Sequence, residues 1–230
     1  MANELFLQTI DSFISKFPIR IFHKGEIIIF QGEVPRGTFF VKSGVIKAYN
    51  LSVHGDEKPV GFYGKGKSFP GSWTYGRVPS SIYYYEAFSN ECRLHQIPRE
   101  EFVDFVHTNP IMALEELDHY ITDTLGLSMQ LNALQHSRAN EKLMYTLHYL
   151  SLTFGKQLKS KQREIQLHLT HQDFANLTGL TRETAATELY KLKHQGVIDY
   201  GNNRPYLVNL AKLQTILNDQ YISELDTSET

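Results

Sequence analysis

The chain has 230 residues and a formal net charge of −2, which suits one large or two modest globular domains and argues against indiscriminate binding of nucleic acid. It is 41% hydrophobic and 12% aromatic and has no run of about 18 apolar residues, so it predicts a folded globular protein without a membrane-spanning segment. The single cysteine, Cys92, excludes an intramolecular disulfide and any zinc or iron–sulfur site that needs several cysteines.

The N-terminal residues predict a short helix and give no sign of export. Residues 5–17 form an amphipathic segment that ends before Pro18, and the segment carries acidic side chains. A secretory signal peptide would instead combine a basic start with an apolar stretch. We therefore expect a cytoplasmic protein with no membrane partner.

Residues 22–97 consist of brief apolar runs separated by glycines. This spacing is typical of short strands joined by tight turns. It predicts an antiparallel jelly roll or barrel, which we call the β-roll. Cys92 falls in one of the expected strands, where we expect a buried and unreactive thiol.

Two helices are predicted after the β-roll. Pro98 opens the first, and Asn109 and Pro110 fit the cap and the first position of the second. The second helix has apolar residues spaced three and four apart over about 24 residues, as in a coiled-coil seam. The seam residues are Leu114, Leu117, Ile121, Leu125 or Ser128, Leu131 and Leu134. The spacing favours a dimerisation helix over residues 109–138, and a core helix packed on its own β-roll is the alternative.

The next segment predicts a further helix, a basic loop and a strand. The helix covers residues 140–154 and ends at Gly155. Residues 156–163 are rich in lysine and arginine and are interpreted as a solvated loop, with contact to DNA phosphate as the alternative. Ile165, Leu167 and Leu169 then alternate as expected for a strand.

Residues 170–196 predict two short helices around a tight turn. Thr170 and Asp173 fit a capping box that opens the first helix, and Gly179 supplies the left-handed position that ends it. Thr181 then fits the cap of a second helix, whose inward-facing residues are Ala185, Leu189 and Leu192. Two short helices joined by a glycine-containing turn form a helix-turn-helix.

The start of the second helix presents polar side chains suited to reading DNA. This part of a recognition helix meets base edges in the major groove. Arg182 can donate two hydrogen bonds to guanine, Glu183 can accept one from cytosine, and Thr187 can contact a phosphate or a thymine methyl group. A surface helix with a solvated charge pair is the alternative reading of so short a motif. The agreement of caps, turn and apolar spacing favours DNA binding.

The segment after this helix predicts a wing and a final helix. Two β-prone runs flank Gly201-Asn202-Asn203-Arg204, a hairpin-turn composition that places Arg204 at the tip as a phosphate contact. Residues 210–222 predict the final helix, followed by a frayed tail. Residues 139–215 hold ten Lys or Arg against six Asp or Glu, a net charge of +4. The helix-turn-helix thus lies in the basic part of the chain, as phosphate binding requires.

The pattern T-x-Q-D-x-A-x-x-T-G-x-T-R-E-T-A from Thr170 to Ala185 resembles the helix-turn-helix signature of the Crp/Fnr family of bacterial transcription regulators. K-G-E at 24–26, Q-G-E at 31–33 and F-V-K-S-G-V-I-K at 40–47 resemble the ligand-sensing β-roll of that family. The resemblance implies an α+β chain in three parts. These are an N-terminal antiparallel β-roll at 1–108, a long dimerisation helix at 109–138 and a C-terminal winged helix-turn-helix at 139–230.

The resemblance also assigns roles at the DNA. Arg182 and Glu183 fall where the family reads bases, and RNA polymerase is the implied protein partner. Family members often carry a second arginine four residues after that glutamate, where this chain has Thr187, so we expect a different half-site. The phosphate contacts of the family fall on Thr170, Gln172, Thr181 and Thr184.

The resemblance places an effector pocket between residues 69 and 87. Members that bind cyclic nucleotides carry Gly-Glu and later Arg-Ser there, whereas this chain has Gly71-Ser72 and Ser81-Ile82. A cyclic nucleotide phosphate would lack its paired cation, so we expect a small organic or aromatic effector instead. The alternative is that successive tyrosines alternate between the core and the surface of a strand. The predicted pocket residues are Gly71, Ser72, Trp73, Tyr75, Ser81, Ile82, Tyr83 and, on the long helix, Ser128.

These features together predict a DNA-binding transcription regulator rather than an enzyme. We expect a homodimer that binds palindromic operators in double-stranded DNA under control of the effector. Two alternatives are an apo-competent regulator with a non-functional pocket and a cupin-like β-roll enzyme. The enzyme would need clustered metal ligands, but His23, His54 and His95 are far apart in the sequence, so we expect no metal and no cofactor.

Overall fold

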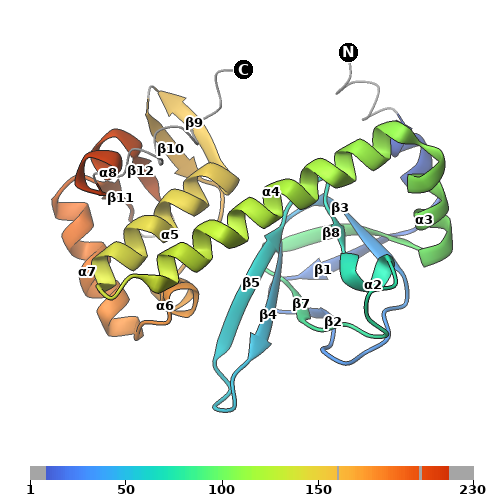
Figure 1. Ribbon diagram of the computed structural model, residues 1–230, viewed down its shortest axis with the longest axis horizontal. Coiled ribbons are helices and arrows are strands. Elements are labelled where there is room, and N and C mark those ends of the chain that lie inside the picture. Colours follow the sequence, from blue (N-terminus) through green and yellow to red (C-terminus); the bar gives the residue numbers. More distant parts are fainter. Residues whose placement is uncertain (1–8, 160, 202–203, 218–230) are drawn as a thin grey trace. The chain divides into compact units, whose positions relative to one another are not determined.

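The computed structural model describes residues 9–159, 161–201 and 204–217 (Figure 1). The chain divides into two compact units, Met1–Thr124 and Leu125–Thr230. The division falls inside one long helix. The sequence-based boundaries after residues 108 and 138 stay predictions. The start of the first predicted helix, the end of the last one and the predicted tail lie outside the described residues.

The first unit contains, within the described residues, eight strands in two four-stranded antiparallel sheets. The first sheet has the order β1-β8-β3-β6 and the second has the order β2-β7-β4-β5. The strands are β1 (Ile19–His23), β2 (Ile27–Ile29), β3 (Thr38–Ser43), β4 (Ile46–Leu51), β5 (Glu57–Tyr63), β6 (Ser68–Phe69), β7 (Tyr84–Ala87) and β8 (Glu91–Ile97). The antiparallel β-roll predicted from the glycine spacing is confirmed.

An aromatic core joins the two sheets. Phe69 is fully buried, and its ring centroid lies 5.5 Å from that of Phe39 and 4.9 Å from that of Tyr85. Burial of a side chain of this size stabilises the fold by about 1.5–3 kcal/mol. Cys92 belongs to the same core and has no exposed surface, and its burial raises the pKa of the thiol. The predicted burial of the thiol is confirmed, and its raised pKa disfavours the reactive thiolate.

Helices close one end of this unit. They are α2 (Gly71–Thr74), α3 (Arg99–Thr108) and the first part of α4 (Pro110–Gln135). Pro98 precedes α3 and Pro110 is the first residue of α4, as the sequence predicts. A second hydrophobic cluster packs α3 and the start of α4 against the helical residues 9–14. In this cluster the ring of Phe13 stacks on that of Phe105 at 3.8 Å.

The predicted seam of α4 is exposed to solvent. Its residues have exposed fractions between 42% at Leu134 and 65% at Leu114. The others in this range are Leu117, Ile121, Leu125 and Leu131. Met112, Glu116 and Ala133 lie on the buried side of the same helix. The helix therefore packs through a face other than the seam, and the apolar seam is left uncovered by the described residues of the chain.

The second unit combines helices with a small sheet of strand order β11-β12-β10-β9. Its elements are the rest of α4, α5 (Ala139–Phe154), β9 (Gly155–Lys159), β10 (Gln162–Ile165), α6 (His171–Thr178), α7 (Arg182–His194), β11 (Ile198–Asp199), β12 (Leu207–Asn209) and α8 (Leu210–Leu217). This is the predicted order of a winged helix-turn-helix. None of the described helices in either unit is long and apolar enough to cross a membrane.

The segment between α5 and α6 differs from the prediction. Most of the basic residues 156–163, interpreted as a loop, lie in β9 and β10, which pair antiparallel with Gln162 opposite Lys159. Lys156 and Lys161 are exposed, whereas Arg163 is buried and donates to the Ser151 carbonyl oxygen of α5 at 3.4 Å, so the basic side chains are not all solvated as predicted. The predicted alternation of Ile165, Leu167 and Leu169 extends beyond the observed strand, because β10 ends at Ile165. Leu167 and Leu169 are nevertheless buried, as their alternation predicts.

Candidate functional site

The first helix of the helix-turn-helix begins at the predicted capping box. The Thr170 hydroxyl oxygen accepts a hydrogen bond from the Asp173 backbone N–H at 3.2 Å, and an Asp173 carboxylate oxygen accepts from the Thr170 backbone N–H at 2.7 Å. The Thr170 hydroxyl also donates to that carboxylate at 2.6 Å. The helix ends at Gly179, whose φ of 66° is left-handed as expected. Local sequence thus fixes both ends of α6.

The second helix, α7, is held by its cap and its buried face. The Thr181 hydroxyl accepts from the Thr184 backbone N–H at 3.2 Å, which satisfies one of the free donors at the helix start. The predicted inward residues Ala185, Leu189 and Leu192 are all buried. Their burial orients α7 so that its opposite side faces solvent.

The predicted base-reading residues lie on this solvent side. Arg182, Glu183 and Thr187 are exposed, and among the described residues their side chains have no hydrogen-bond or ion-pair partner. Arg182 lies close enough to α6 to influence His171, whose pKa is lowered by burial and, to a smaller extent, by the arginine charge. The first turn of α7 therefore offers an unpaired guanidinium and an unpaired carboxylate to a ligand.

The residues predicted to contact phosphate differ in their hydrogen bonding. Gln172 is exposed and donates to Asn176 at 2.8 Å. The hydroxyls of Thr170 and Thr181 cap their helices, and the hydroxyl of Thr184 is hydrogen-bonded to that of Thr181 at 3.0 Å. These threonines therefore have a structural role at the positions where phosphate contacts are predicted.

The wing follows α7 and is held beside its end by polar contacts. Its strands, β11 and β12, pair antiparallel. Lys193 near the end of α7 forms an ion pair of 3.0 Å with Asp199 and donates to the Tyr200 carbonyl oxygen. Arg204, which follows the two asparagines of the predicted turn, is exposed. The asparagines themselves lie outside the described residues. Sequence reasoning missed Lys193, for which the cluster of basic residues at the end of the helix was the available signal.

The predicted effector residues cluster only in part. Trp73 in α2 is buried under the Arg99 guanidinium, which lies 5.2 Å from the ring centroid. Ser81 is buried and donates to the Tyr83 carbonyl oxygen at 2.7 Å, whereas Ile82 is exposed. Ser72 is partly buried, and Ser128 lies in the second unit on the exposed side of α4. The role of these residues as a pocket stays a prediction.

Two of the predicted effector residues contact α4 within the first unit. The Tyr75 hydroxyl donates to the Glu116 carboxylate at 3.0 Å, and the Tyr120 hydroxyl lies against Gly71 and leaves no room for a side chain there. Ser68 also donates to Glu116, at 3.1 Å. Burial raises the pKa of Glu116, an effect that these hydrogen bonds oppose. The predicted effector region is therefore joined directly to the helix that carries the exposed seam.

A β-roll followed by a winged helix-turn-helix defines a class of two-domain transcription regulators. Residues 19–109 match the model of the cyclic nucleotide-binding domain, and residues 141–216 match that of the Crp-like helix-turn-helix domain. The chain belongs to the Crp/Fnr family of transcription regulators.

Similar proteins have been characterised in several bacteria. Electron transport regulator A of Shewanella oneidensis is 26% identical over 223 residues, which cover 96% of this chain and 86% of that protein. The fumarate nitrate reduction regulatory protein of Klebsiella oxytoca is 29% identical over 199 residues, covering 85% and 76%. The structure of the c-di-GMP-responsive regulator CLP of Xanthomonas campestris matches with a TM-score of 0.68 at 20% identity, covering 88% of this chain and 98% of that one. At this identity the structural match supports the fold.

The capping geometry predicts the effect of Thr170→Ala on stability. Loss of the cap should lower the free energy of unfolding of the second unit by about 1 kcal/mol, since the Asp173 N–H loses its acceptor and the Asp173 carboxylate keeps only its hydrogen bond from the backbone N–H of residue 170. Urea denaturation followed by circular dichroism measures the change. Thr187→Ala is the matched control, because its hydroxyl caps nothing, and it should change stability by less than about 0.5 kcal/mol. Equal losses in the two variants would contradict the capping role.

Proposed function

We propose that the protein is a homodimeric regulator that binds palindromic operators, with α7 of each protomer in the major groove. The exposed, unpaired Arg182 at the start of α7 is the observation that carries this proposal. A guanidinium there can donate two hydrogen bonds to one guanine, and Glu183 beside it can accept from a cytosine. Thr187 one turn later completes the base-reading set. The family membership of the chain supports the same role.

Phosphate contacts position α7 on the duplex. Arg204 on the wing and Gln172 on α6 are exposed, so both side chains can reach the DNA backbone. Thr181 and Thr184 share one hydrogen bond between their hydroxyls, which leaves one hydroxyl proton of the pair to donate to a phosphate oxygen. The Thr170 hydroxyl donates to Asp173, so it would have to turn its proton away from that carboxylate to donate to a phosphate. Because these contacts are electrostatic or polar, affinity should fall steeply with salt.

The exposed seam of α4 supports a dimer. Six large apolar side chains with exposed fractions between 42% and 65% form one stripe on this helix, which is unusual for a surface left in water. Their spacing of three and four suits a two-stranded coiled coil. Two-fold pairing along α4 would present two recognition helices, which palindromic half-sites require.

A small effector that is not a cyclic nucleotide is proposed to act through the region 69–87. Ser72 and Ser81 stand where cyclic nucleotide-binding members carry an acid and an arginine. A ligand that altered the Tyr75–Glu116 bond or the Gly71–Tyr120 contact would act on α4, and thereby on the dimer. We further propose that the regulator acts in the cytoplasm and contacts RNA polymerase, as its resemblance to the family implies.

An apo-competent regulator is the second candidate. Tyr63, Phe69 and Tyr85 pack their rings together in the core of the β-roll, with centroids 4.9–5.7 Å apart. Such filling by side chains favours a β-roll that keeps its conformation without a ligand. DNA binding by purified protein with no small molecule added distinguishes the two candidates.

Arg182→Ala should relax sequence specificity. Binding to the preferred operator should weaken by about 1–3 kcal/mol, and discrimination should be lost at one base pair in each half-site. Titration of an operator and of its single-base variants measures both effects. Arg204→Ala is the control, because a phosphate contact should weaken binding to all sequences alike and reduce the salt slope by about one. Uniform loss in the Arg182 variant would show that this residue does not read bases.

Ile121→Asp should dissociate the dimer. The Ile121 side chain is 58% exposed in the single chain, so the substitution should change the stability of the monomer little. In a dimer paired along α4 it would place two carboxylates against each other. Sedimentation equilibrium should show a dimer for the native protein and a monomer for this variant. Thr122→Asp introduces the same charge at an exposed neighbouring position outside the seam and should leave the dimer intact. A dimer that survives Ile121→Asp would place the interface elsewhere.

A further inference from the structure

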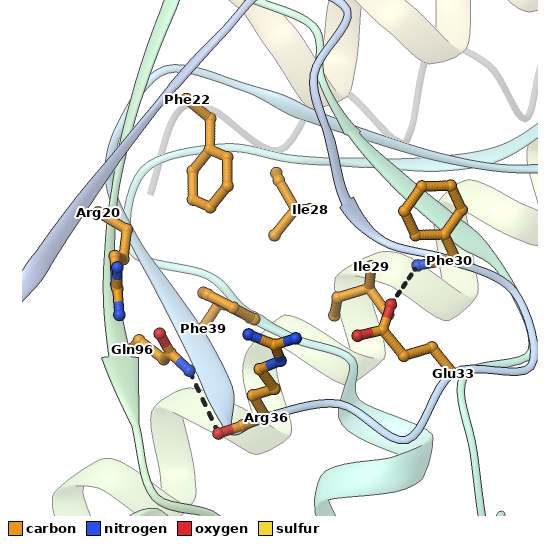
Figure 2. Close-up of a pocket in the computed structure, with 9 residues that line it drawn as sticks. All are labelled: Arg20, Phe22, Ile28, Ile29, Phe30, Glu33, Arg36, Phe39 and Gln96. Carbon is orange, nitrogen blue, oxygen red and sulfur yellow. Dashed lines mark hydrogen bonds between the residues drawn. The ribbon is translucent and has the colours of Figure 1, made fainter.

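A cavity of about 350 Å³ opens in the β-roll, and none of the predicted effector residues lines it, although the backbone of Ser81 is hydrogen-bonded to that of its lining residue Glu33 at 2.8 Å (Figure 2). It lies beside β1 and β2, which are the edge strands of the two sheets, and beside the segment that joins β2 to β3. Because β1 and β2 each end their sheet, the space between the two sheets is open to solvent beside them. The volume is at the small end of the range for ligand pockets, which is about 300–1,000 Å³.

Two guanidinium groups border this cavity. Arg20 comes from β1 and Arg36 from the segment between β2 and β3. Figure 2 shows the side chain of Arg36 pointing from its loop towards Phe39 and Ile29, not away from the cavity. Among the described residues, neither guanidinium has a hydrogen-bond or ion-pair partner. Both charges are thus available to a bound anion.

The remaining surface of the cavity is largely apolar. Phe22, Ile28 and Phe39 form its floor, and the rings of Phe22 and Phe39 meet edge to face with centroids 6.4 Å apart. Glu33 is the one carboxylate among the lining residues. One of its oxygens, Oε2, accepts a hydrogen bond from the Phe30 backbone N–H at 3.2 Å, and among the described residues it forms no ion pair with Arg36.

We propose that this cavity binds a small organic carboxylate with an apolar body. The planar fork of an arginine matches the two oxygens of a carboxylate, and the aromatic and aliphatic floor suits a phenyl or alkyl group. A doubly charged phosphate fits less well, because Glu33 adds a negative charge at the polar side of the site. The proposal concerns binding alone and stands whether or not the ligand changes DNA affinity.

Isothermal titration calorimetry of the full chain tests the site. The probes are phenylacetate, 4-phenylbutyrate and octanoate, each compared with its neutral amide. At least one acid should bind saturably and about two- to fivefold more tightly than its amide, which is the range expected for an exposed ion pair. Arg20→Gln and Arg36→Gln should each remove about that factor for the acid and leave amide binding unchanged.

Arg77→Gln is the matched control. Arg77 is another exposed arginine of the same unit, but it lies beside the predicted effector residues and not in this cavity. The Arg77→Gln variant should bind the acid with the same affinity as the native protein. Absence of saturable binding by every acid, equal affinity for acid and amide, or loss of binding in the Arg77 variant but not in the Arg36 variant would each overturn the proposal. Unchanged circular dichroism of all variants shows that folding is not the cause.

Discussion

The exposure of Arg182 depends on the burial of the opposite face of α7. Ala185, Leu189 and Leu192 are buried where α7 contacts α5 and α6, and each leucine contributes about 1.5–3 kcal/mol through the apolar area removed from water. This packing prevents α7 from rotating about its axis. A recognition helix that is fixed in this way can present the same side chains to every operator without an ordering cost at binding.

Helix α4 has two chemically different faces. Its inner face carries Glu116, a buried carboxylate that needs the hydrogen bonds from Ser68 and Tyr75 because burial without partners would be costly. Asp123, further along the helix, forms an ion pair with Lys67 of the β-roll. The outer face carries the leucine seam. A change in the polar contacts would therefore act on the element proposed to join two protomers.

Local signals in the sequence predicted the helix-turn-helix well. The Thr170 capping box, the left-handed Gly179 and the Thr181 cap each involve residues at most a few positions apart, so their geometry follows from the chain itself. The β-roll was predictable from its glycine spacing. The pairing of β9 with β10 was not, because it buries Arg163 against Ser151 of α5, and a local run of basic residues does not indicate such a tertiary contact.

Contacts between distant residues escaped prediction. The Tyr75–Glu116 hydrogen bond and the cavity between Arg20 and Arg36 each join segments that are separated in the sequence and brought together by the sheets. No spacing rule indicates such pairs. Lys193 and its partner Asp199 are only a few residues apart in the sequence. Their ion pair nevertheless depends on the wing folding back beside α7.

Footprinting of genomic fragments selected by the purified protein tests the central claim most directly. The account predicts that the bound fragments share one palindrome, protected in two major-groove half-sites about one helical turn apart, as expected for a dimer with one recognition helix per protomer. Fragments that share no sequence, or that carry a single unpaired half-site, would contradict it.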